Sequence, residues 1–385
     1  MYKKAEIAGK GEPLNFVTSS VPVAPPGMVR VKTAFAGVCH SDLHIINDEL
    51  GHVKNYGEET FRGMVLGHEV SGYVDCSGEG VNLSHYDLRQ GDPVVLFPWA
   101  GCSECVVCKA GHTNVCSTPG AGRNSIGCGP DAPGGYQTHV LVKPHALMKV
   151  PPEIPMDVAC MLPCSAGTAY SALVKLKEAI YFGDLRRGKA RLLIIGAGGL
   201  GLWAVQIAKA MFQGIHVIIA DISDSKFQLA KIYGADETIL WNEAAEPSDN
   251  ASAILESGTV DAVVDFCSYD STFNAGLKSL GKNGAIVLAG LYGGTLSANA
   301  IGVVFGAIDI RGNNVLTYNQ LSDVVGLAAQ GKVVFPGCSF YPFEQLNVVL
   351  DKLKQGEVVG RALIDFNNIY TQNARLSNVS FEEDK

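Results

Sequence analysis

The stretch Arg191-Leu192-Leu193-Ile194-Ile195-Gly196-Ala197-Gly198-Gly199-Leu200-Gly201 decides the fold that we expect for this chain. Its apolar first half predicts a buried strand, and its glycines predict a tight turn directly after that strand. The apolar spacing from Leu200 to Phe212 then predicts an amphipathic helix. A strand, a glycine turn and a helix in this order are typical of the first unit of a parallel, doubly wound sheet.

The same alternation continues along the chain. Further strands are expected at 216–220, 261–266 and 285–289, and helices at 225–233 and 271–280. We therefore predict an α/β domain built on a doubly wound parallel sheet for residues 166–317.

The glycine turn also indicates a cofactor. Its glycines permit a tight turn, close approach of the backbone to a pyrophosphate and close packing of helix on strand, while the helix N-terminus faces the phosphates. Asp221 ends the next strand, where its carboxylate can accept from a ribose 2′-hydroxyl and would repel a 2′-phosphate. NAD is therefore expected rather than NADP, and 166–317 is expected to be a dinucleotide-binding domain. The candidate contacts in the turn are Gly196, Gly198, Gly199, Leu200 and Gly201. A purely structural glycine turn is the alternative.

The first part of the chain has a different pattern. Short apolar or alternating runs at 28–38, 69–76, 93–97 and 138–142 are separated by turn residues, which predicts a barrel-like antiparallel β domain. After residue 317, helices at 321–330 and 343–355 and strands at 333–335 and 362–365 are expected to return to it. We therefore assign 1–165 plus 318–385 to one domain.

Composition excludes several classes of function. The 385 residues carry a net charge of −8 without a Lys/Arg-rich run, which argues against a nucleic-acid partner. Glycines interrupt the apolar run 192–208, so no membrane span is expected, and 1–10 does not predict a secretory signal. Eleven cysteines, four of them crowded between 102 and 116, favour metal binding in a reducing, cytoplasmic compartment.

The crowded cysteines have the spacing of a metal site. Cys102-x2-Cys105-x2-Cys108-x7-Cys116 can place four thiolates tetrahedrally around one structural zinc ion. Four unrelated thiols or an iron–sulfur cluster are the alternatives. Because four cysteines leave no open ligand position, such a site stabilises the fold of its own loop and does not catalyse.

A second candidate set is spread over three motifs. These motifs are Gly37-Val38-Cys39-His40-Ser41-Asp42-Leu43-His44, Gly67-His68-Glu69 and Leu162-Pro163-Cys164. Each is weak alone, because an isolated Cys or His is often only packed in a core. Together, Cys39, His68 and Cys164 form a Cys, His, Cys set with an open fourth position, which is typical of catalytic zinc.

All of these motifs occur in the order found in the zinc-dependent medium-chain alcohol dehydrogenase family, which the chain resembles over nearly its whole length. The resemblance implies a GroES-like catalytic domain, NAD and two zinc ions per chain. It also implies hydride transfer between NAD and a small-molecule alcohol or carbonyl substrate. Cys39, His68 and Cys164 match the ligands of the catalytic zinc, and the four-cysteine loop matches the structural site.

The resemblance also implies roles around the metal and the cofactor. Ser41 matches the residue that bonds the substrate hydroxyl, and His44 matches the histidine that ends a proton relay. Asp42 resembles the carboxylate that orients the ligand histidine, and Glu69 resembles a glutamate near the zinc. Four further residues match cofactor contacts: His40, Asp221, Lys226 and Arg361.

Two segments differ from the classical animal enzymes of this family. The segment between Cys39 and His68 is longer and contains the polar run 47–62, whereas the segment between Cys116 and Cys164 is shorter. The shorter segment resembles the microbial branch, which implies a homotetramer, with a dimer as the alternative. Two other functions stay open: a reductase of activated double bonds or aldehydes, and a crystallin-like or regulatory protein without turnover. The zinc ligands, Ser41 and His44 favour the alcohol dehydrogenase.

Overall fold

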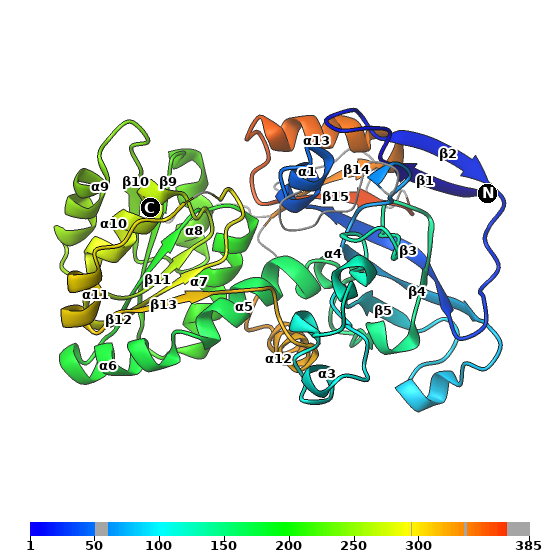
Figure 1. The fold of residues 1–385 in the computed structure, drawn as a ribbon, viewed down its shortest axis with the longest axis horizontal. Coiled ribbons are helices and arrows are strands. Elements are labelled where there is room, and N and C mark those ends of the chain that lie inside the picture. The colour runs from blue at the N-terminus through cyan, green and yellow to red at the C-terminus, as the bar shows by residue number, and fades with distance from the viewer. Residues whose placement is uncertain (51–60, 294, 335–336, 368–385) are drawn as a thin grey trace, which may run out of the picture. The chain divides into compact units, whose positions relative to one another are not determined.

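The computed structural model describes residues 1–50, 61–293, 295–334 and 337–367 (Figure 1). The chain forms two compact units. The first unit contains Met1–Cys164, Thr317–Val325 and the chain from Gly337 onward, and the second contains Ser165–Leu316 and a segment that begins at Gly326. The expected bounds placed all of 318–385 in the first domain. The structure differs because the segment after Gly326 bonds to the second unit, where Val334 donates its N–H to Gln206 Oε1 at 2.8 Å.

The second unit is built on a six-stranded sheet in the order β10-β9-β8-β11-β12-β13. All neighbouring strands are parallel, which confirms the predicted doubly wound sheet. The strands are β8 (Arg191–Ile195), β9 (His216–Asp221), β10 (Glu237–Leu240), β11 (Val260–Asp265), β12 (Leu280–Leu288) and β13 (Asp309–Gly312).

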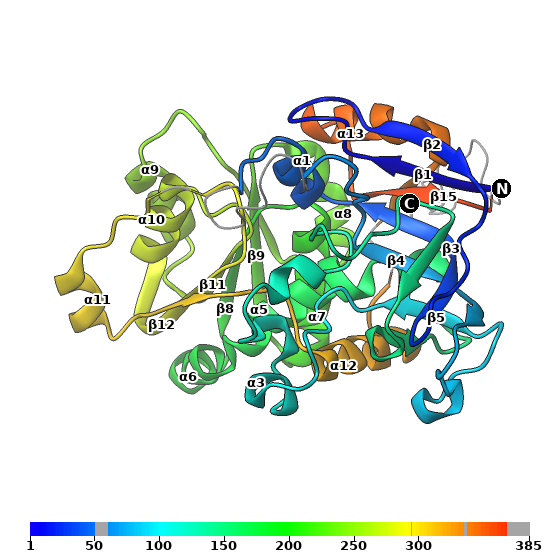
Figure 2. The same cartoon turned by 45° about the vertical axis from the view of Figure 1, so that its right-hand side comes forward.

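Helices cover this sheet on both faces, with α9 and α10 on one side and α7 and α8 on the other (Figure 2). The helices are α5 (Gly167–Val174), α6 (Lys177–Arg187), α7 (Gly199–Met211), α8 (Phe227–Ile232), α9 (Pro247–Leu255), α10 (Asp270–Ser279) and α11 (Ala300–Gly306), with the 3₁₀ turn η6 (Asp224–Lys226) before α8. Six helices and strands of this second unit were not predicted: β10, β13, α5, α6, α9 and α11. Two of them show why, since α5 is buried on almost every side and β13 is mostly exposed, so neither has a one-sided apolar pattern.

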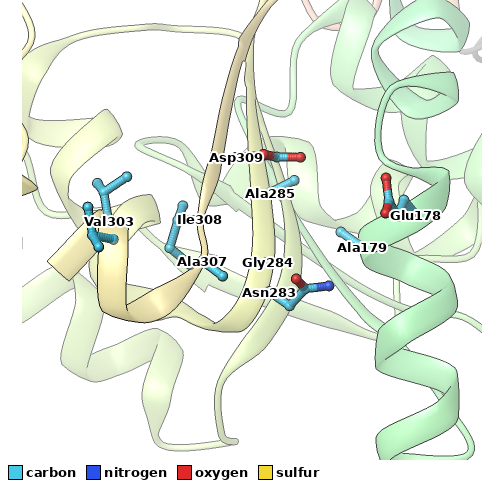
Figure 3. A pocket seen from close by; sticks show the side chains of 10 residues that line it. Glu178, Ala179, Asn283, Gly284, Ala285, Val303, Ala307, Ile308 and Asp309 are labelled. Atoms are coloured by element: carbon cyan, nitrogen blue, oxygen red, sulfur yellow. The ribbon is translucent and has the colours of Figure 1, made fainter.

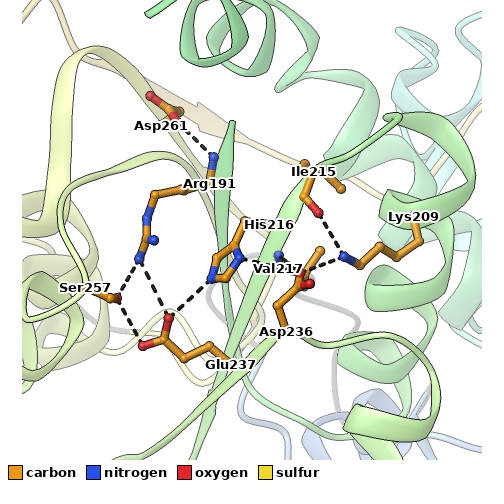
Figure 4. Close-up of polar contacts among 9 residues, drawn as sticks. All are labelled: Arg191, Lys209, Ile215, His216, Val217, Asp236, Glu237, Ser257 and Asp261. Atoms are coloured by element: carbon orange, nitrogen blue, oxygen red, sulfur yellow. Dashed lines mark hydrogen bonds and ion pairs between the residues drawn. The ribbon is translucent and has the colours of Figure 1, made fainter. Parts of the chain in front are cut away.

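A group of polar contacts lies at the amino ends of β8, β9 and β10 (Figure 4). The guanidinium of Arg191 donates to Ser257 Oγ at 2.5 Å, and His216 Nε2 lies 3.3 Å from Glu237 Oε2. Beside them, Asp236 pairs with Lys209 at 2.6 Å. In a parallel sheet the carboxyl ends lie at the opposite edge, where ligands usually bind. The glycine turn after β8 and Asp221 at the end of β9 both lie at that edge.

The first unit is built on a mainly antiparallel sheet in the order β14-β15-β3-β4-β5-β7. Strand β3 is its centre: β4 pairs with one side, while β6 and β15 pair with successive parts of the other. Only β14 and β15 are parallel among these neighbours. The strands are β3 (Val29–Val38), β4 (Glu69–Ser77), β5 (Pro93–Leu96), β6 (His139–Val142), β7 (Leu147–Lys149), β14 (Cys338–Pro342) and β15 (Arg361–Asp365), with the separate ribbon β1 (Tyr2–Glu6) and β2 (Asn15–Ser19).

The first unit also contains helices and short helical turns. The helices are α1 (His40–Ile46), α3 (Val106–Lys109), α4 (Met156–Ala159), α12 (Tyr318–Ala329, which begins in this unit) and α13 (Leu346–Lys354). The tighter or wider turns are η1 (Leu83–Tyr86), η2 (Thr113–Val115), η3 (Ala121–Asn124), η4 (Pro144–Ala146), the π-helical η5 (Leu162–Ala166) and η7 (Phe343–Gln345). Helix α1 shares an apolar core with α13, in which Ile45 and Ile46 are buried with Leu346 and Val349.

The strand predicted at 333–335 is wrong for 333 and 334, the two of its residues that the structure describes. Val333 and Val334 lie outside any strand, because the N–H of Val334 bonds to a side chain instead of a neighbouring strand. The strand of this region is β14, a few residues later. Residue 335, most of the run 47–62 and the tail 377–385 lie outside the described residues. Of the helices in the described part of the chain, none is both long enough and apolar enough to cross a bilayer.

Candidate active site and metal centres

Three side chains from distant parts of the chain meet in the first unit. Cys39 directly follows β3, His68 directly precedes β4, and Cys164 lies in the turn η5. One ligand atom from each lies within 4.8 Å of the others, and all three residues are buried. Strand pairing explains part of this meeting: because Gly37 lies opposite Glu69 in the antiparallel β3–β4 pair, the residues that flank these strand ends come together.

The chemistry of this donor set fits a zinc ion. Imidazole and two thiolates are preferred zinc ligands, and three protein ligands leave a position for a substrate. The hydrogen bond from Cys164 lowers the pKa of Cys39 well below its usual range, although burial opposes this. The same hydrogen bond, together with burial, raises the pKa of Cys164. The two sulfurs therefore share a proton that a divalent cation would displace.

The imidazole lies in surroundings of negative charge. Burial acts to lower the pKa of His68, but the charges of Cys128, Cys164 and Asp42 outweigh burial and raise this pKa well above its usual value. Such surroundings stabilise a cation at this point of the unit. The fit of the three donors to a cation therefore rests on charge as well as on geometry.

Asp42 connects two of these donors. Its Oδ2 accepts hydrogen bonds from the N–H of Cys39 at 3.0 Å and the hydroxyl of Tyr136 at 2.7 Å. Its Oδ1 lies 3.4 Å from His68 Nδ1. With Nδ1 facing a carboxylate, Nε2 is the ring nitrogen that is left for a metal. Burial, reinforced by the charge of Asp42, raises the pKa of Tyr136, so its hydroxyl stays protonated and donates.

Glu69 and Arg361 form a buried ion pair beside the three donors. Arg361 Nε donates to Glu69 Oε2 at 2.8 Å, and its second nitrogen lies 2.5 Å from Oε1. Burial raises the pKa of Glu69, and the guanidinium opposes this rise. The contact of Arg361 with a cofactor pyrophosphate stays a prediction, whereas its pairing with Glu69 was not predicted.

The relay candidates lie on α1. Cys39 Sγ and Ser41 Oγ are 3.7 Å apart, which places the hydroxyl at the edge of the donor set. His44 is buried and its Nδ1 lies 2.5 Å from Glu49 Oε2, whereas the side chain of Glu49 is 50% exposed. The hydrogen bond with His44 lowers the pKa of Glu49. A charged group in contact with solvent therefore lies directly behind the buried histidine. His40 is half-buried at the start of the same helix.

The four-cysteine loop gathers its sulfurs as the spacing predicted. The Sγ atoms of Cys102, Cys105, Cys108 and Cys116 lie within 4.8 Å of one another, and all four cysteines are free of disulfides. Backbone N–H groups point at the sulfurs: that of Cys105 donates to Cys102 Sγ at 3.3 Å, and that of Cys108 donates to Cys105 Sγ at 3.4 Å.

The thiols of this loop differ in pKa. A hydrogen bond from Thr118 lowers the pKa of Cys102 to about 7, and one from Ser117 lowers that of Cys105 to about 5. Burial raises the pKa of Cys108 to about 12. Two thiolates are therefore available near neutral pH to start binding a cation, which would then deprotonate the others.

The glycine turn of the second unit has the form that a dinucleotide needs. Gly196 has φ +99°, and a Cβ on Gly201 would collide with the carbonyl oxygen of Gly196, so only glycine permits helix α7 to begin this close to β8. Asp221 accepts the N–H of Ala197 at 2.7 Å and pairs with Lys226 at 2.9 Å. The structure thus brings the predicted Asp221 and Lys226 to the glycine turn.

Two residues of the site were missed in the sequence. Tyr136 lies 94 positions from its partner Asp42, and Glu49 lies in a polar run without a motif. For Tyr136 the preceding Gly134-Gly135 pair is a signal that backbone packs closely there, since a Cβ on Gly135 would collide with Val70. For Glu49 the sequence holds no comparable signal.

A cavity in the second unit is separate from these residues. It has a volume of about 420 Å³ and lies among α6, β12, α11 and β13 (Figure 3). Its lining includes Glu178, Asn283, Val304 and Asp309, and none of the metal or cofactor candidates. The candidate site therefore rests on the donor sets and the glycine turn.

Comparison with known proteins agrees with this geometry. Residues 25–152 match the alcohol dehydrogenase GroES-like domain, and residues 199–330 match the zinc-binding dehydrogenase family. The NAD-dependent alcohol dehydrogenase of Saccharolobus solfataricus is 30% identical over 355 residues, which is 92% of this chain and 97% of the relative. That of Sulfolobus acidocaldarius is 32% identical over 356 residues, which is 92% of this chain and 96% of the relative.

Solved structures show the same architecture. The alcohol dehydrogenase of Aeropyrum pernix has a TM-score of 0.81 at 30% identity and covers 94% of this chain and 99% of its own. The acetophenone reductase of Geotrichum candidum in complex with NAD has a TM-score of 0.78 at 30% identity, with 96% and 98% covered. Fold and site define a zinc-binding, nicotinamide-linked oxidoreductase of two units. The chain belongs to the zinc-dependent medium-chain alcohol dehydrogenase family.

Proposed function

We propose that this protein is an NAD-dependent zinc alcohol dehydrogenase that interconverts a small alcohol and its aldehyde or ketone. The observation that carries the proposal is the buried cluster of Cys39, His68 and Cys164, with ligand atoms within 4.8 Å of one another. The relatives named NAD-dependent alcohol dehydrogenase support the reaction, and the acetophenone reductase supports its reverse direction.

The chemistry divides between the bound groups and the residues of the chain. Zinc, when bound, supplies a Lewis acid that polarises the substrate oxygen, and NAD accepts or returns the hydride. Cys39, His68 and Cys164 would hold the zinc, and Asp42 orients the imidazole. We assign a second, structural zinc to the four-cysteine loop, so that each chain holds two. Glu69 lies next to the donor set, paired with Arg361.

The substrate proton leaves through side chains of α1. Ser41 would bond the substrate hydroxyl and pass on its proton, and the buried His44 would end the relay beside Glu49. Glu49 accepts from Nδ1–H of His44 and so keeps the other ring nitrogen as the proton acceptor.

The cofactor would bind at the glycine turn of the second unit. Gly196, Gly198, Gly199, Leu200 and Gly201 would face its pyrophosphate. Asp221 would accept from the adenosine ribose, with Lys226 beside it. His40 and Arg361 are proposed as further pyrophosphate contacts by family resemblance.

Replacing Asp221 by glycine is expected to relax the preference for NAD. The change removes a charged hydrogen-bond acceptor, worth about 1.5–3 kcal/mol, so the ratio of kcat/KM for NAD to that for NADP should fall about 10- to 100-fold. Initial rates with both cofactors measure this ratio. Asp224→Ala, an exposed carboxylate nearby, is the control and should leave the ratio unchanged. An unchanged ratio in Asp221→Gly would remove Asp221 from cofactor selection.

His44→Ala is expected to slow alcohol oxidation at pH 7. A positioned acid–base group contributes roughly 10²–10⁴-fold. Because solvent can partly replace the relay, we expect a loss of about 10- to 100-fold, near or below the lower end of that range. Added imidazole should restore part of the rate, since it fits the space left by the side chain. His85→Ala, an exposed histidine of η1, is the control. A wild-type rate in His44→Ala would exclude the relay role.

The substrate class and the assembly are tested directly. A panel of primary, secondary, aromatic and polyol alcohols, scored by NADH formation, identifies the substrate. A chain without turnover on the whole panel, in either direction, would favour the binding-protein alternative.

We propose a cytoplasmic homotetramer, on the similarity of the segment between Cys116 and Cys164 to the microbial branch. The mass of the protein in solution tests this assembly against a dimer.

A further inference from the structure

The hydroxyl of Tyr136 contacts the residue that connects two of the proposed metal ligands. Tyr136 is fully buried and donates to Asp42 Oδ2 at 2.7 Å. The same oxygen accepts the N–H of Cys39, and the other carboxylate oxygen lies 3.4 Å from His68 Nδ1. One side chain thus holds the carboxylate between the two ligands.

The backbone of Tyr136 is tied to the segment that carries His68. The N–H of Tyr136 donates to the carbonyl of Leu66 at 2.9 Å, and that of Gly135 donates to the carbonyl of Gly67 at 2.7 Å. Gly67 has φ +92°, and a Cβ there would lie 2.7 Å from Tyr136 Cδ1. The ring therefore covers Gly67 closely, directly before His68.

We infer that Tyr136 is a positioning residue of the catalytic metal site, which acts through Asp42 to hold His68 in the orientation that binds the metal. This inference rests on the proposed function of Cys39, His68 and Cys164. The ring and the backbone bonds place the segment, and the hydroxyl sets the rotation of the carboxylate. Without the hydroxyl, Asp42 keeps one donor on Oδ2, so its plane is free to turn away from His68.

The expected loss of zinc affinity can be judged from other residues that contact a metal ligand without contacting the metal. Partners that orient a ligand histidine change metal affinity by about 10- to 100-fold when they are removed. Tyr136 acts one contact further out, so we expect about a 10-fold loss for its hydroxyl alone. The four-cysteine loop shares no residue with this network, and its zinc should be unaffected.

Tyr136→Phe tests the inference because it removes the hydroxyl and keeps the ring against Gly67. The purified protein is equilibrated in a series of zinc buffers, and bound zinc per chain is measured at each free zinc concentration. The wild type should lose its two zinc ions in two steps. In the variant, only the step of the Cys39, His68, Cys164 site should move, to about 10-fold higher free zinc. The step of the four-cysteine loop serves as the internal standard.

Tyr2→Phe is the matched control. The hydroxyl of Tyr2 bonds to the side chain of Gln137, next to Tyr136 in the chain, but it does not contact Asp42. Its removal should leave both steps in place. A second test combines Tyr136→Phe with Asp42→Ala: if Tyr136 acts through Asp42, it should add less than about 2-fold in that background.

The outcomes separate this inference from the proposed function. Two steps at wild-type positions in Tyr136→Phe would overturn the positioning role and leave the metal site standing. A single zinc step in the wild type would overturn the metal site itself. A shift of both steps together would show a general loss of structure, and would likewise count against a specific role for the hydroxyl.

Discussion

Cys164→Ser is expected to abolish turnover while the fold stays intact. The replacement preserves the volume of the buried side chain but removes one of two thiolates that would hold the zinc. Because Lewis-acid stabilisation is worth several kcal/mol, we expect kcat/KM to fall by about 10³-fold or more. Zinc bound per chain should fall from about two to about one, since the four-cysteine loop is untouched.

Cys160→Ser is the matched control for this variant. Cys160 is also buried, four residues earlier, and its thiol donates to the carbonyl of Asp157 at 3.1 Å, a bond that serine can keep. It belongs to neither metal-binding group, so activity and zinc content should stay near the wild type. Full zinc content in Cys164→Ser, measured by metal analysis on protein of normal circular dichroism, would refute the ligand assignment.

Arg361→Ala is expected to produce the largest loss of stability among single replacements near the site. Glu69 is fully buried, and its carboxylate has both oxygens within 2.8 Å of the guanidinium. Removing one partner of a buried pair leaves an uncompensated charge, which typically costs about 3–5 kcal/mol. Urea unfolding at a fixed free zinc concentration measures this loss, since bound metal also contributes to stability.

Two further variants separate the ion pair from other effects. Arg89→Ala removes the exposed arginine of a surface pair with Asp92 and should cost no more than about 1 kcal/mol. Replacing Glu69 and Arg361 together by methionine should cost less than Arg361→Ala alone, because no buried charge is then left. A double variant as unstable as the sum of the single ones would mean that the two side chains do not stabilise each other.

Apolar runs bounded by turn residues predicted the buried strands of the second unit, and apolar periodicity predicted the helix that follows the glycine turn. Strand β8 and the helix after it were predicted to within a residue, because a buried strand followed by glycines leaves few alternatives. Elements without such a pattern were missed. Helix α5 is buried nearly all round, and α11 exposes most of its apolar side chains, so neither shows a single apolar stripe.

The amino-acid sequence by itself determined the features whose residues are neighbours in the chain. The four cysteines between 102 and 116 and the glycines between 196 and 201 need only local backbone geometry to converge, so their spacing predicted their chemistry. Cys39, His68 and Cys164 formed a candidate set only by residue type, because no spacing in the chain joins them, and the family resemblance was needed to assign them as ligands. Their meeting depends on the register of β3 with β4 and on the turn η5.

Only the tertiary structure showed which side chains bond to Asp42 and Glu69 beside these ligands. Tyr136 and Asp42 are 94 positions apart, and Glu69 and Arg361 are 292 apart. Contacts at such separations leave no periodicity or spacing in the sequence, because they arise from strand order and from burial of polar groups that must find partners. The chain thus carries its binding motifs locally, whereas the contacts that orient His68 and pair with Glu69 exist only once the sheet has assembled.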